Sequence, residues 1–273
     1  MNRRHLDVLA WPGGGEPLEL DATRRAEGEI VEGFLVDPVQ LRAGVVAAGV
    51  ALLPPDLDAW IRAHGNVIAR TPLNDPRVVR RLRRVAGAGH DAVPFEEVTA
   101  HYRDLVRDAP DGFDTTAHPD DVALVEALRA RVSGRPVGRG LVIGCGVGRL
   151  VFELRAFADT VLGLDWSLAR VRRARNIAVT EGPFLLPVPT PRAPGTPKEV
   201  PIDLEALVRD GVDFVAGDGA ALPLADGCCD LVVLAAGDGR GPWADAERVH
   251  AEARRVLAPG GILLDATTPD AVA

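Results

Sequence analysis

The stretch LVIGCGVGRL, residues 141–150, carries the strongest structural signal in this sequence. A short apolar run leads into Gly144, Gly146 and Gly148, and the residues that follow have the spacing of a helix. A strand that passes through a glycine-rich turn into a helix is typical of nucleotide-binding α/β domains, although such turns also arise for packing alone. The dinucleotide fingerprint G-x-G-x-x-G needs glycine where this chain has Arg149, so the spacing disfavours an NAD-dependent oxidoreductase.

The alternation of strand and helix continues from about residue 138 onward. Strands that alternate with helices of about ten residues predict a parallel, doubly wound sheet. Ligands bind such sheets beyond the carboxyl ends of the strands, which is where the three glycines lie. The strand-like runs are 140–144, 160–165, 212–218, 230–238 and 261–267, and the helix-like runs are 147–158, 167–178 and 245–257.

Four motifs in this part of the chain occur in the order and spacing of a known family. IGCGVGRL and LGLDWS are followed by VAGDGAALPLADGCCDLVVL (215–234) and EARRVLAPGGILLDAT (252–267). Over residues 138–267 they resemble the strand motifs of class I S-adenosylmethionine-dependent methyltransferases. The resemblance implies a Rossmann-like α/β fold, S-adenosylmethionine as the cofactor and methyl transfer as the activity.

The resemblance also implies roles for individual residues. Gly144, Gly146 and Gly148 would line the methionine and ribose portions of the cofactor, and Trp166 would pack on its adenine. Asp165 ends the second strand, where its carboxylate would accept hydrogen bonds from the ribose hydroxyls.

The third-strand motif supplies the rest of the predicted cofactor site. Asp218 would accept a hydrogen bond from the adenine amine, and the backbone of Gly219 and Ala220 would read the edge of the ring. Residues 235–238, at the end of the fourth strand, would face the sulfonium and the acceptor.

The acceptor side has no assigned catalytic residue. A base is needed only if the acceptor arrives protonated, and His101, Asp238 and Arg240 are the polar candidates. No Asn-Pro-Pro-Tyr segment follows the fourth strand, which disfavours the common amide, adenine and glutamine N-methyltransferases.

Two features depart from the family pattern. Many members carry an acid two residues before the first glycine, and this chain has Val142 there. The sequence also ends at Ala273, where the family sheet normally continues with two more strands. An unpaired fifth strand would leave open backbone groups at a sheet edge. We therefore expect another element, from this chain or from a second subunit in a homo-oligomer, to cover it.

The N-terminal part has a second resemblance. HLDVLAWPGGGEPLELD (5–21) and the segment 27–57 look like a small zinc-ribbon protein, the shared activating partner of several tRNA, rRNA and release-factor methyltransferases. The ribbon's cysteines would fall at Trp11, Gly14, Asp37 and Gln40, none of which forms a thiolate site. We therefore expect no metal, and a ribbon-like β module at 1–57 that depends on docking against the methyltransferase domain. The alternative is an unrelated hairpin-rich extension.

The sequence thus divides into the module 1–57, a helical linker or lid at 58–137, and the Rossmann-like domain at 138–273. Helical spacing occurs at 55–69, 76–87, 94–108 and 118–132, and such a segment commonly covers the cofactor in this class of enzyme. His101 and Tyr102 either face the pocket or pack on the surface. The proline-rich insertion 181–200 is expected to be a flap without regular structure through most of its length.

Composition restricts the partners and the compartment. The net charge of −8 disfavours nucleic acid as a partner, and Cys145, Cys228 and Cys229 are too few for a disulfide framework. No run of about 18 apolar residues and no signal peptide is present, so we expect a cytoplasmic protein that does not enter membranes.

Two functional hypotheses remain from the sequence. The first is an S-adenosylmethionine-dependent methyltransferase with an unidentified acceptor. The second is a non-catalytic S-adenosylmethionine-binding or scaffold protein, which Val142 and the missing strands and zinc ligands would suit. Retention of the three glycines, Asp165 and Asp218 favours the enzyme.

Overall fold

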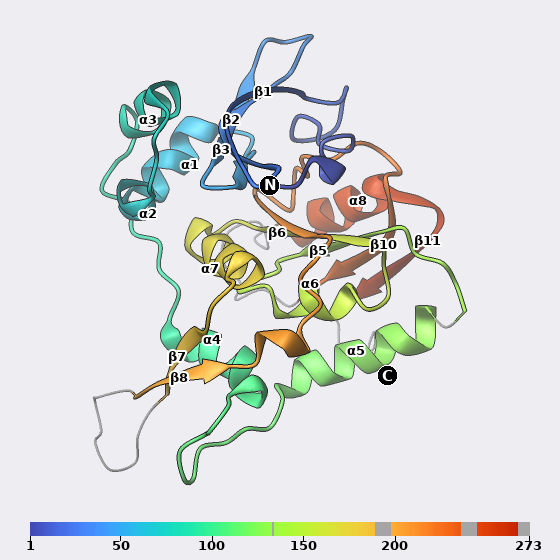
Figure 1. The fold of residues 1–273 in the computed structure, drawn as a ribbon. Helices are drawn as coiled ribbons and strands as arrows, with labels where there is room; N and C mark the ends of the chain where they lie inside the picture. The colour runs from blue at the N-terminus through green and yellow to red at the C-terminus, as the bar shows by residue number, and fades with distance from the viewer. Residues whose placement is uncertain (133, 189–197, 236–244, 267–273) are drawn as a thin grey trace.

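The computed structural model describes residues 1–132, 134–188, 198–235 and 245–266 (Figure 1). Within them, nine strands form one mixed sheet in the order β1-β2-β3-β4-β9-β6-β5-β10-β11. The last five are mutually parallel, so the alternation seen after residue 138 predicted a Rossmann-like α/β sheet correctly. These five strands are β5 (Arg139–Ile143), β6 (Thr160–Asp165), β9 (Val212–Ala216), β10 (Cys229–Leu234) and β11 (Leu257–Asp265).

Apolar layers cover both faces of this sheet, because alternate residues of a strand point to opposite sides. On β5, Val142 belongs to one layer, and Leu141 and Ile143 belong to the other. Helices α5, α6 and α7 contribute to the first layer, and α8 contributes to the second together with the start of the chain (Figure 1). These helices are α5 (Pro119–Val132), α6 (Arg149–Leu154), α7 (Leu168–Val179) and α8 (Ala246–Val256).

The N-terminal strands extend the same sheet. They form an antiparallel meander, and its last strand runs parallel to β9 through the pairs Ala51–Val215 and Leu52–Ala216. The backbone N–H of Leu53 continues this pairing by donating to the carbonyl of Ala216 at 2.9 Å. The N-terminal segment therefore joins the parallel sheet by strand addition, while its ribbon-like character and its dependence on this docking stay predictions. Its strands are β1 (Glu19–Ala26), β2 (Glu29–Val36), β3 (Ala43–Ala47) and β4 (Val50–Leu52).

The two turns at which a zinc ribbon would place its ligands are joined by side chains. The guanidinium of Arg42 lies 4.3 Å from the centre of the Trp11 ring, and it donates to the Asp37 carboxylate at 3.0 Å. The same carboxylate accepts from the backbone of Val39 and Gln40, at 2.9 and 3.0 Å. These contacts, and the arginine charge, hold the pKa of Asp37 below its usual range. An arginine stacked on tryptophan and paired with aspartate therefore links the two turns.

The four helical runs predicted before residue 138 are present, with one break. The first run divides at His64, and the next residue, Gly65, lies against the backbone of Gly87, where a Cβ atom would come within 1.9 Å of the carbonyl oxygen. No spacing rule reveals such a contact between distant segments. The helices of this segment before α5 are α1 (Leu57–Ala63), α2 (Gly65–Arg70), α3 (Pro76–Arg83) and α4 (Phe95–Tyr102).

The insertion at 181–200 is more regular than its prolines suggested. β7 (Phe184–Val188) and β8 (Lys198–Ile202) form an antiparallel pair, while residues 189–197 lie outside the described part. Both strands contain proline, which is tolerated here because each strand is fully paired along one side only; the other side of β8 forms a single bridge with Val106. The pair packs against α4, where the hydroxyl of Thr99 donates to the carbonyl of Pro187 at 3.3 Å.

Within the described residues β11 is the last strand of the sheet and pairs with β10 alone. The expectation that another element covers its free edge stays a prediction. None of the described helices has the length and apolar character needed to cross a membrane.

Candidate cofactor and acceptor site

A cavity of about 1170 Å³ opens at the carboxyl ends of the parallel strands. One wall includes Gly144 and Gly146 after β5, Asp165 and Trp166 at the end of β6, and Ala235 after β10. Four of the residues predicted to bind the cofactor therefore share one wall. The opposite wall comes from the helical segment before β5, which the sequence suggested as a lid.

The three glycines serve two different purposes. All have positive φ, which side chains rarely tolerate: 74° at Gly144, 52° at Gly146 and 90° at Gly148. A Cβ at Gly146 would have its nearest neighbour 3.5 Å away, whereas one at Gly148 would lie 2.6 Å from the methyl group of Ala174. Gly148 does not line the cavity, so its immediate role is to let α6 and α7 pack closely.

Asp165 is held by the loop it faces. Its carboxylate accepts from the backbone N–H of Gly146 at 3.0 Å and of Ser167 at 2.8 Å, and the residue is 9 % exposed. Burial raises the pKa of Asp165 to about 6, although both hydrogen bonds act in the opposite direction. A carboxylate fixed in this way beside a glycine turn is suited to accept hydroxyl donors from a ligand.

Trp166 links the cavity wall to the lid. Its carbonyl accepts from the indole N–H of Trp60 at 3.0 Å, and its ring meets the rings of Trp60 and His64 edge-on, with centroids 6.5 and 5.9 Å apart. The predicted stacking on adenine would have to use the part of the ring that faces the cavity.

Asp218 and Ala220 do not line this cavity, although the neighbouring Gly217 donates its backbone N–H to the carbonyl of Asp165 at 3.0 Å. Asp218 and Ala220 line a second, smaller hollow of about 480 Å³ against α8, and Gly219 lines neither space. The carboxylate of Asp218 accepts from the backbone N–H of Ala220 at 2.8 Å. The structure therefore brings Gly144, Gly146, Asp165 and Trp166 together around the larger cavity, and the adenine-binding role of the turn at 218–220 stays a prediction. Asp238 and Arg240 lie outside the described residues.

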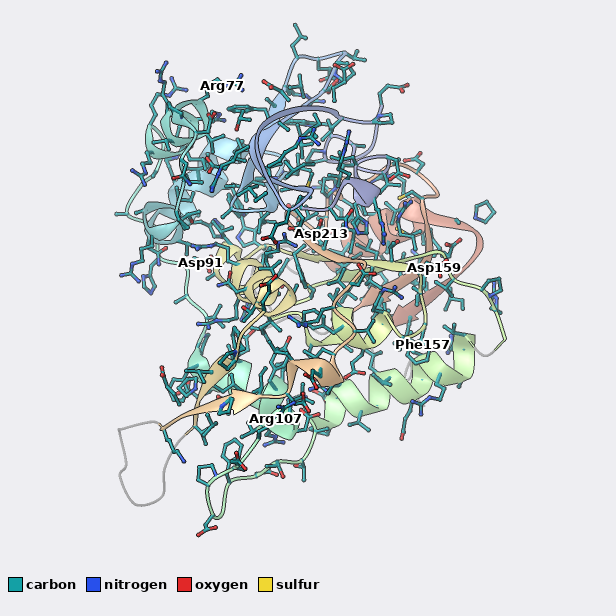
Figure 2. All side chains as sticks on the ribbon, in the orientation of Figure 1. Arg77, Asp91, Arg107, Phe157, Asp159 and Asp213 are labelled. Atoms are coloured by element: carbon teal, nitrogen blue, oxygen red, sulfur yellow. The ribbon has the colours of Figure 1, made fainter. Side chains whose placement is uncertain are left out.

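Asp91 fastens the lid to the start of α7, a role that no motif predicted. Its two carboxylate oxygens accept from the hydroxyl of Ser167 at 2.6 Å and the backbone N–H of Ala169 at 2.8 Å (Figure 2). Ser167 in turn caps α7 by accepting from Arg170 at 3.2 Å, as its position predicted.

Two arginines anchor α4 to the helices after the strands. Arg170 of α7 forms a bidentate pair with Glu97 of α4, with N–O distances of 2.9 and 3.0 Å. Arg149, at the start of α6, forms another with Asp104, at 2.7 and 2.9 Å. Charge-assisted bidentate pairs fix orientation as well as position. Arg149 therefore positions the helical segment that forms the opposite wall of the cavity.

His101 and Tyr102 differ in orientation. Tyr102 is fully buried and donates to the carbonyl of Val147 at 2.9 Å, so it supports the glycine turn from below. His101 lines the cavity, and its Nδ1 lies 2.7 Å from the carboxylate of Asp121. Burial alone would lower the pKa of His101, but the hydrogen bond and charge of Asp121 outweigh it and raise the pKa. The ring of His118 stacks on that of His101, with centroids 4.7 Å apart.

One family model matches the part of the chain that runs from β5 to β11. Residues 141–265 match the family model of a methyltransferase domain. This match supports S-adenosylmethionine as the cofactor, as the motifs implied.

Individual relatives cover less of the chain. A ubiquinone/menaquinone biosynthesis C-methyltransferase, UbiE, from Acidiphilium cryptum is 50% identical over 52 residues, which are 19% of this chain and 20% of that protein. The chain thus matches about one fifth of the length of this curated relative.

Similar solved structures include a putative S-adenosyl-L-methionine-dependent methyltransferase from Methanococcus maripaludis and the PH0226 protein from Pyrococcus horikoshii. The first is 24% identical, with a TM-score of 0.39 over 54% of this chain and 55% of its own. The second is 21% identical, with a TM-score of 0.41 over 63% and 62%.

Proposed function

We propose that this protein is an S-adenosylmethionine-dependent methyltransferase. Its acceptor, a small molecule or a macromolecule, is not yet identified. The observation that carries the proposal is the shared cavity: the glycine turn and Asp165 form one wall, and titratable lid residues form the other. At about 1170 Å³ the cavity exceeds the roughly 300–1,000 Å³ of typical ligand pockets, so it leaves room for a second molecule.

The residues present suit the cofactor. Gly144 and Gly146 allow a ligand to approach the backbone closely, and Asp165 offers a carboxylate whose geometry is fixed by two backbone donors. When bound, S-adenosylmethionine supplies an electrophilic methyl group on a sulfonium. The protein's own task is then to position the acceptor and to exclude water. The lid anchored by Glu97 and Asp104 does both.

The alternative is a non-catalytic cofactor-binding or scaffold protein. Val142 is fully buried in the sheet, so no acid stands where many family members hold the cofactor's amino group. A scaffold, however, has no need for an open cavity with titratable groups facing the glycine turn. The open cavity therefore favours the enzyme.

For residues 1–57 we propose the role of an activator built into the same chain. Their four strands continue the catalytic sheet beyond β9 and so protect an edge that would otherwise be unpaired. This arrangement supports a stabilising role that needs no zinc.

The test is calorimetric titration with S-adenosylmethionine of the intact chain and of the Asp165→Ala variant. We expect micromolar binding by the intact chain and a loss of at least tenfold in the variant. Asp159→Ala is the control, since Asp159 is exposed and away from the cavity (Figure 2). Binding that is equal in all three proteins would contradict the proposed site.

Catalysis is tested by incubating the protein with methyl-labelled cofactor and fractions of cell extract. Transfer of label to an acceptor, absent in Asp165→Ala, supports the enzyme. Cofactor binding without transfer to any fraction favours the scaffold.

A further inference from the structure

Two histidines and an aspartate converge on the lid side of the cavity. His101 lies near the end of α4, His118 immediately precedes α5, and Asp121 lies in the first turn of α5. One potential ligand atom from each residue lies within 4.8 Å of the other two. All three residues line the same cavity as Gly146 and the other cofactor residues.

The cluster contains a polar atom that the protein does not satisfy. Nδ1 of His118 is buried and has no hydrogen-bond partner among the described residues. A buried nitrogen without a partner is destabilising unless water or a ligand meets it. The ring packs against His101, which contacts the carboxylate of Asp121; that carboxylate is 7 % exposed.

Within the part of the chain that the structure describes, no ion pair joins Asp121 to an arginine or lysine side chain. Arg149 is the closest candidate, because it donates to the backbone carbonyl of His101 at 2.8 Å. Its remaining donors go to the carboxylates of Asp104 and Glu153. Glu97 also lines the cavity, where it pairs with Arg170.

We propose that His101, His118 and Asp121 bind one divalent first-row transition-metal ion, such as Zn²⁺, Fe²⁺ or Co²⁺. Two imidazoles and one carboxylate are ligands that these ions share, and alkaline-earth ions prefer oxygen ligands alone. In a tetrahedral site with bonds of about 2.0–2.1 Å, ligand atoms lie about 3.3 Å apart. The cluster reaches this arrangement if the 2.7 Å contact between His101 and Asp121 opens and the other atoms move inward.

Three protein ligands leave at least one coordination position open toward the cavity, which is the pattern of catalytic rather than structural metal sites. Given the proposed methyltransferase function, on which this step rests, the open position would hold an oxygen of the acceptor. The inferred substrate class is therefore an acceptor with a hydroxyl, enol or carbonyl oxygen next to the atom that is methylated.

The experiment uses the full chain, freed of metal by a chelator and titrated with Co²⁺ while visible absorption is recorded. Binding of one equivalent, with the spectrum of nitrogen and oxygen ligands, is the expected result. His118→Ala and His101→Ala should each weaken binding by more than about 100-fold, since even the partners of metal ligands contribute 10–100-fold. His90→Ala is the matched control and should bind normally, because His90 lines the same cavity outside the cluster.

X-ray absorption on the zinc-loaded intact chain provides a second measurement that needs no variant. Two imidazole ligands in its spectrum support the proposal, and an all-oxygen shell overturns it. Unchanged Co²⁺ affinity in His118→Ala, or no stoichiometric binding by the intact chain, also overturns it. The second result would leave His101 and Asp121 as a hydrogen-bonded pair without metal.

Titration with S-adenosylmethionine, with and without metal, separates this proposal from the previous one. Metal binding by a chain that does not bind the cofactor supports the metal site and contradicts the methyltransferase function. Cofactor binding by a chain that binds no metal supports the methyltransferase function and contradicts the metal site.

Discussion

At the scale of single residues, Asp165 makes cofactor binding depend on pH. Its pKa is raised to about 6 by burial, so below that pH it is largely protonated and offers one acceptor fewer to the ribose hydroxyls. We expect the affinity for S-adenosylmethionine to be constant above pH 7 and to fall by up to tenfold per pH unit below about 6. Calorimetry between pH 5 and 8 measures this.

The raised pKa of Asp165 also makes the free energy of unfolding depend on pH, and in the direction opposite to that of cofactor affinity. Because the folded pKa exceeds the unfolded value of 3.8, the folded state binds this proton more tightly, and the stabilising contribution is lost as the pH rises through about 6. Asp165→Asn is the control for both effects: its weaker cofactor affinity should show no titration near pH 6. A flat profile in the intact chain would assign the ribose to another group.

Gly148 is a second residue whose role can be separated from ligand binding. In Gly148→Ala the new methyl group would lie 2.6 Å from Cβ of Ala174 and 3.1 Å from the ring of Phe214, at a φ of 90°. Overpacking and the left-handed backbone together should lower the free energy of unfolding by about 2–4 kcal/mol. Urea denaturation measures it. Gly28→Ala, with φ 81° and no atom within 4 Å, should show the backbone part alone, about 1–2 kcal/mol.

At the scale of elements, Arg42, which links the two N-terminal turns, contributes measurably to thermal stability. Arg42→Met removes the contacts with Trp11 and Asp37, and we expect the midpoint of thermal unfolding to fall by about 2–4 °C. Arg77→Met is matched, since Arg77 also lies over a ring, that of Phe34, and pairs with Asp21 (Figure 2). Arg77 and Asp21 are both half-exposed, so that variant should change the midpoint by less than about 1 °C. Equal shifts would mean that the link has no special role.

The elements also show what the sequence could and could not predict. Alternating apolar runs predicted the five parallel strands, and Ser167 predicted the start of α7, because these signals are local. The break at His64 and the β7–β8 pair were missed, since both depend on contacts with segments far along the chain. The residues of the cavity likewise divide into those that a local motif predicts and those that only long-range packing brings to the site. Gly144 and Asp165 lie in recognisable motifs, whereas Asp91 and His118 reach the site only through the long-range packing of the lid.

At the scale of the whole molecule, one buried arginine joins the N-terminal strands to the parallel sheet. Arg175 on α7 forms an ion pair with Glu29 of β2 and lies 3.8 Å from the carboxylate of Asp213 in β9. Arg175 is 6 % exposed and Asp213 is fully buried. The backbone N–H groups of Asn2 and Phe214 also donate to Asp213. Segments separated by up to 211 positions therefore share one buried charge cluster.

Removal of this arginine should weaken the whole chain and not the N-terminal strands alone. Arg175→Met leaves Asp213 buried without its cation, which should lower the free energy of unfolding by about 3 kcal/mol. Arg172→Met is the control on the same helix. Within the described residues the guanidinium of Arg172 donates to the hydroxyl of Thr71 alone, so this substitution should lower the free energy of unfolding by about 1 kcal/mol. If β1–β4 and the parallel sheet form one cooperative unit, urea unfolding of Arg175→Met, followed by Trp fluorescence and by circular dichroism, shows one coincident transition. Two separated transitions would mean that the N-terminal strands unfold independently, and that strand addition at β9 does not couple them to the parallel sheet.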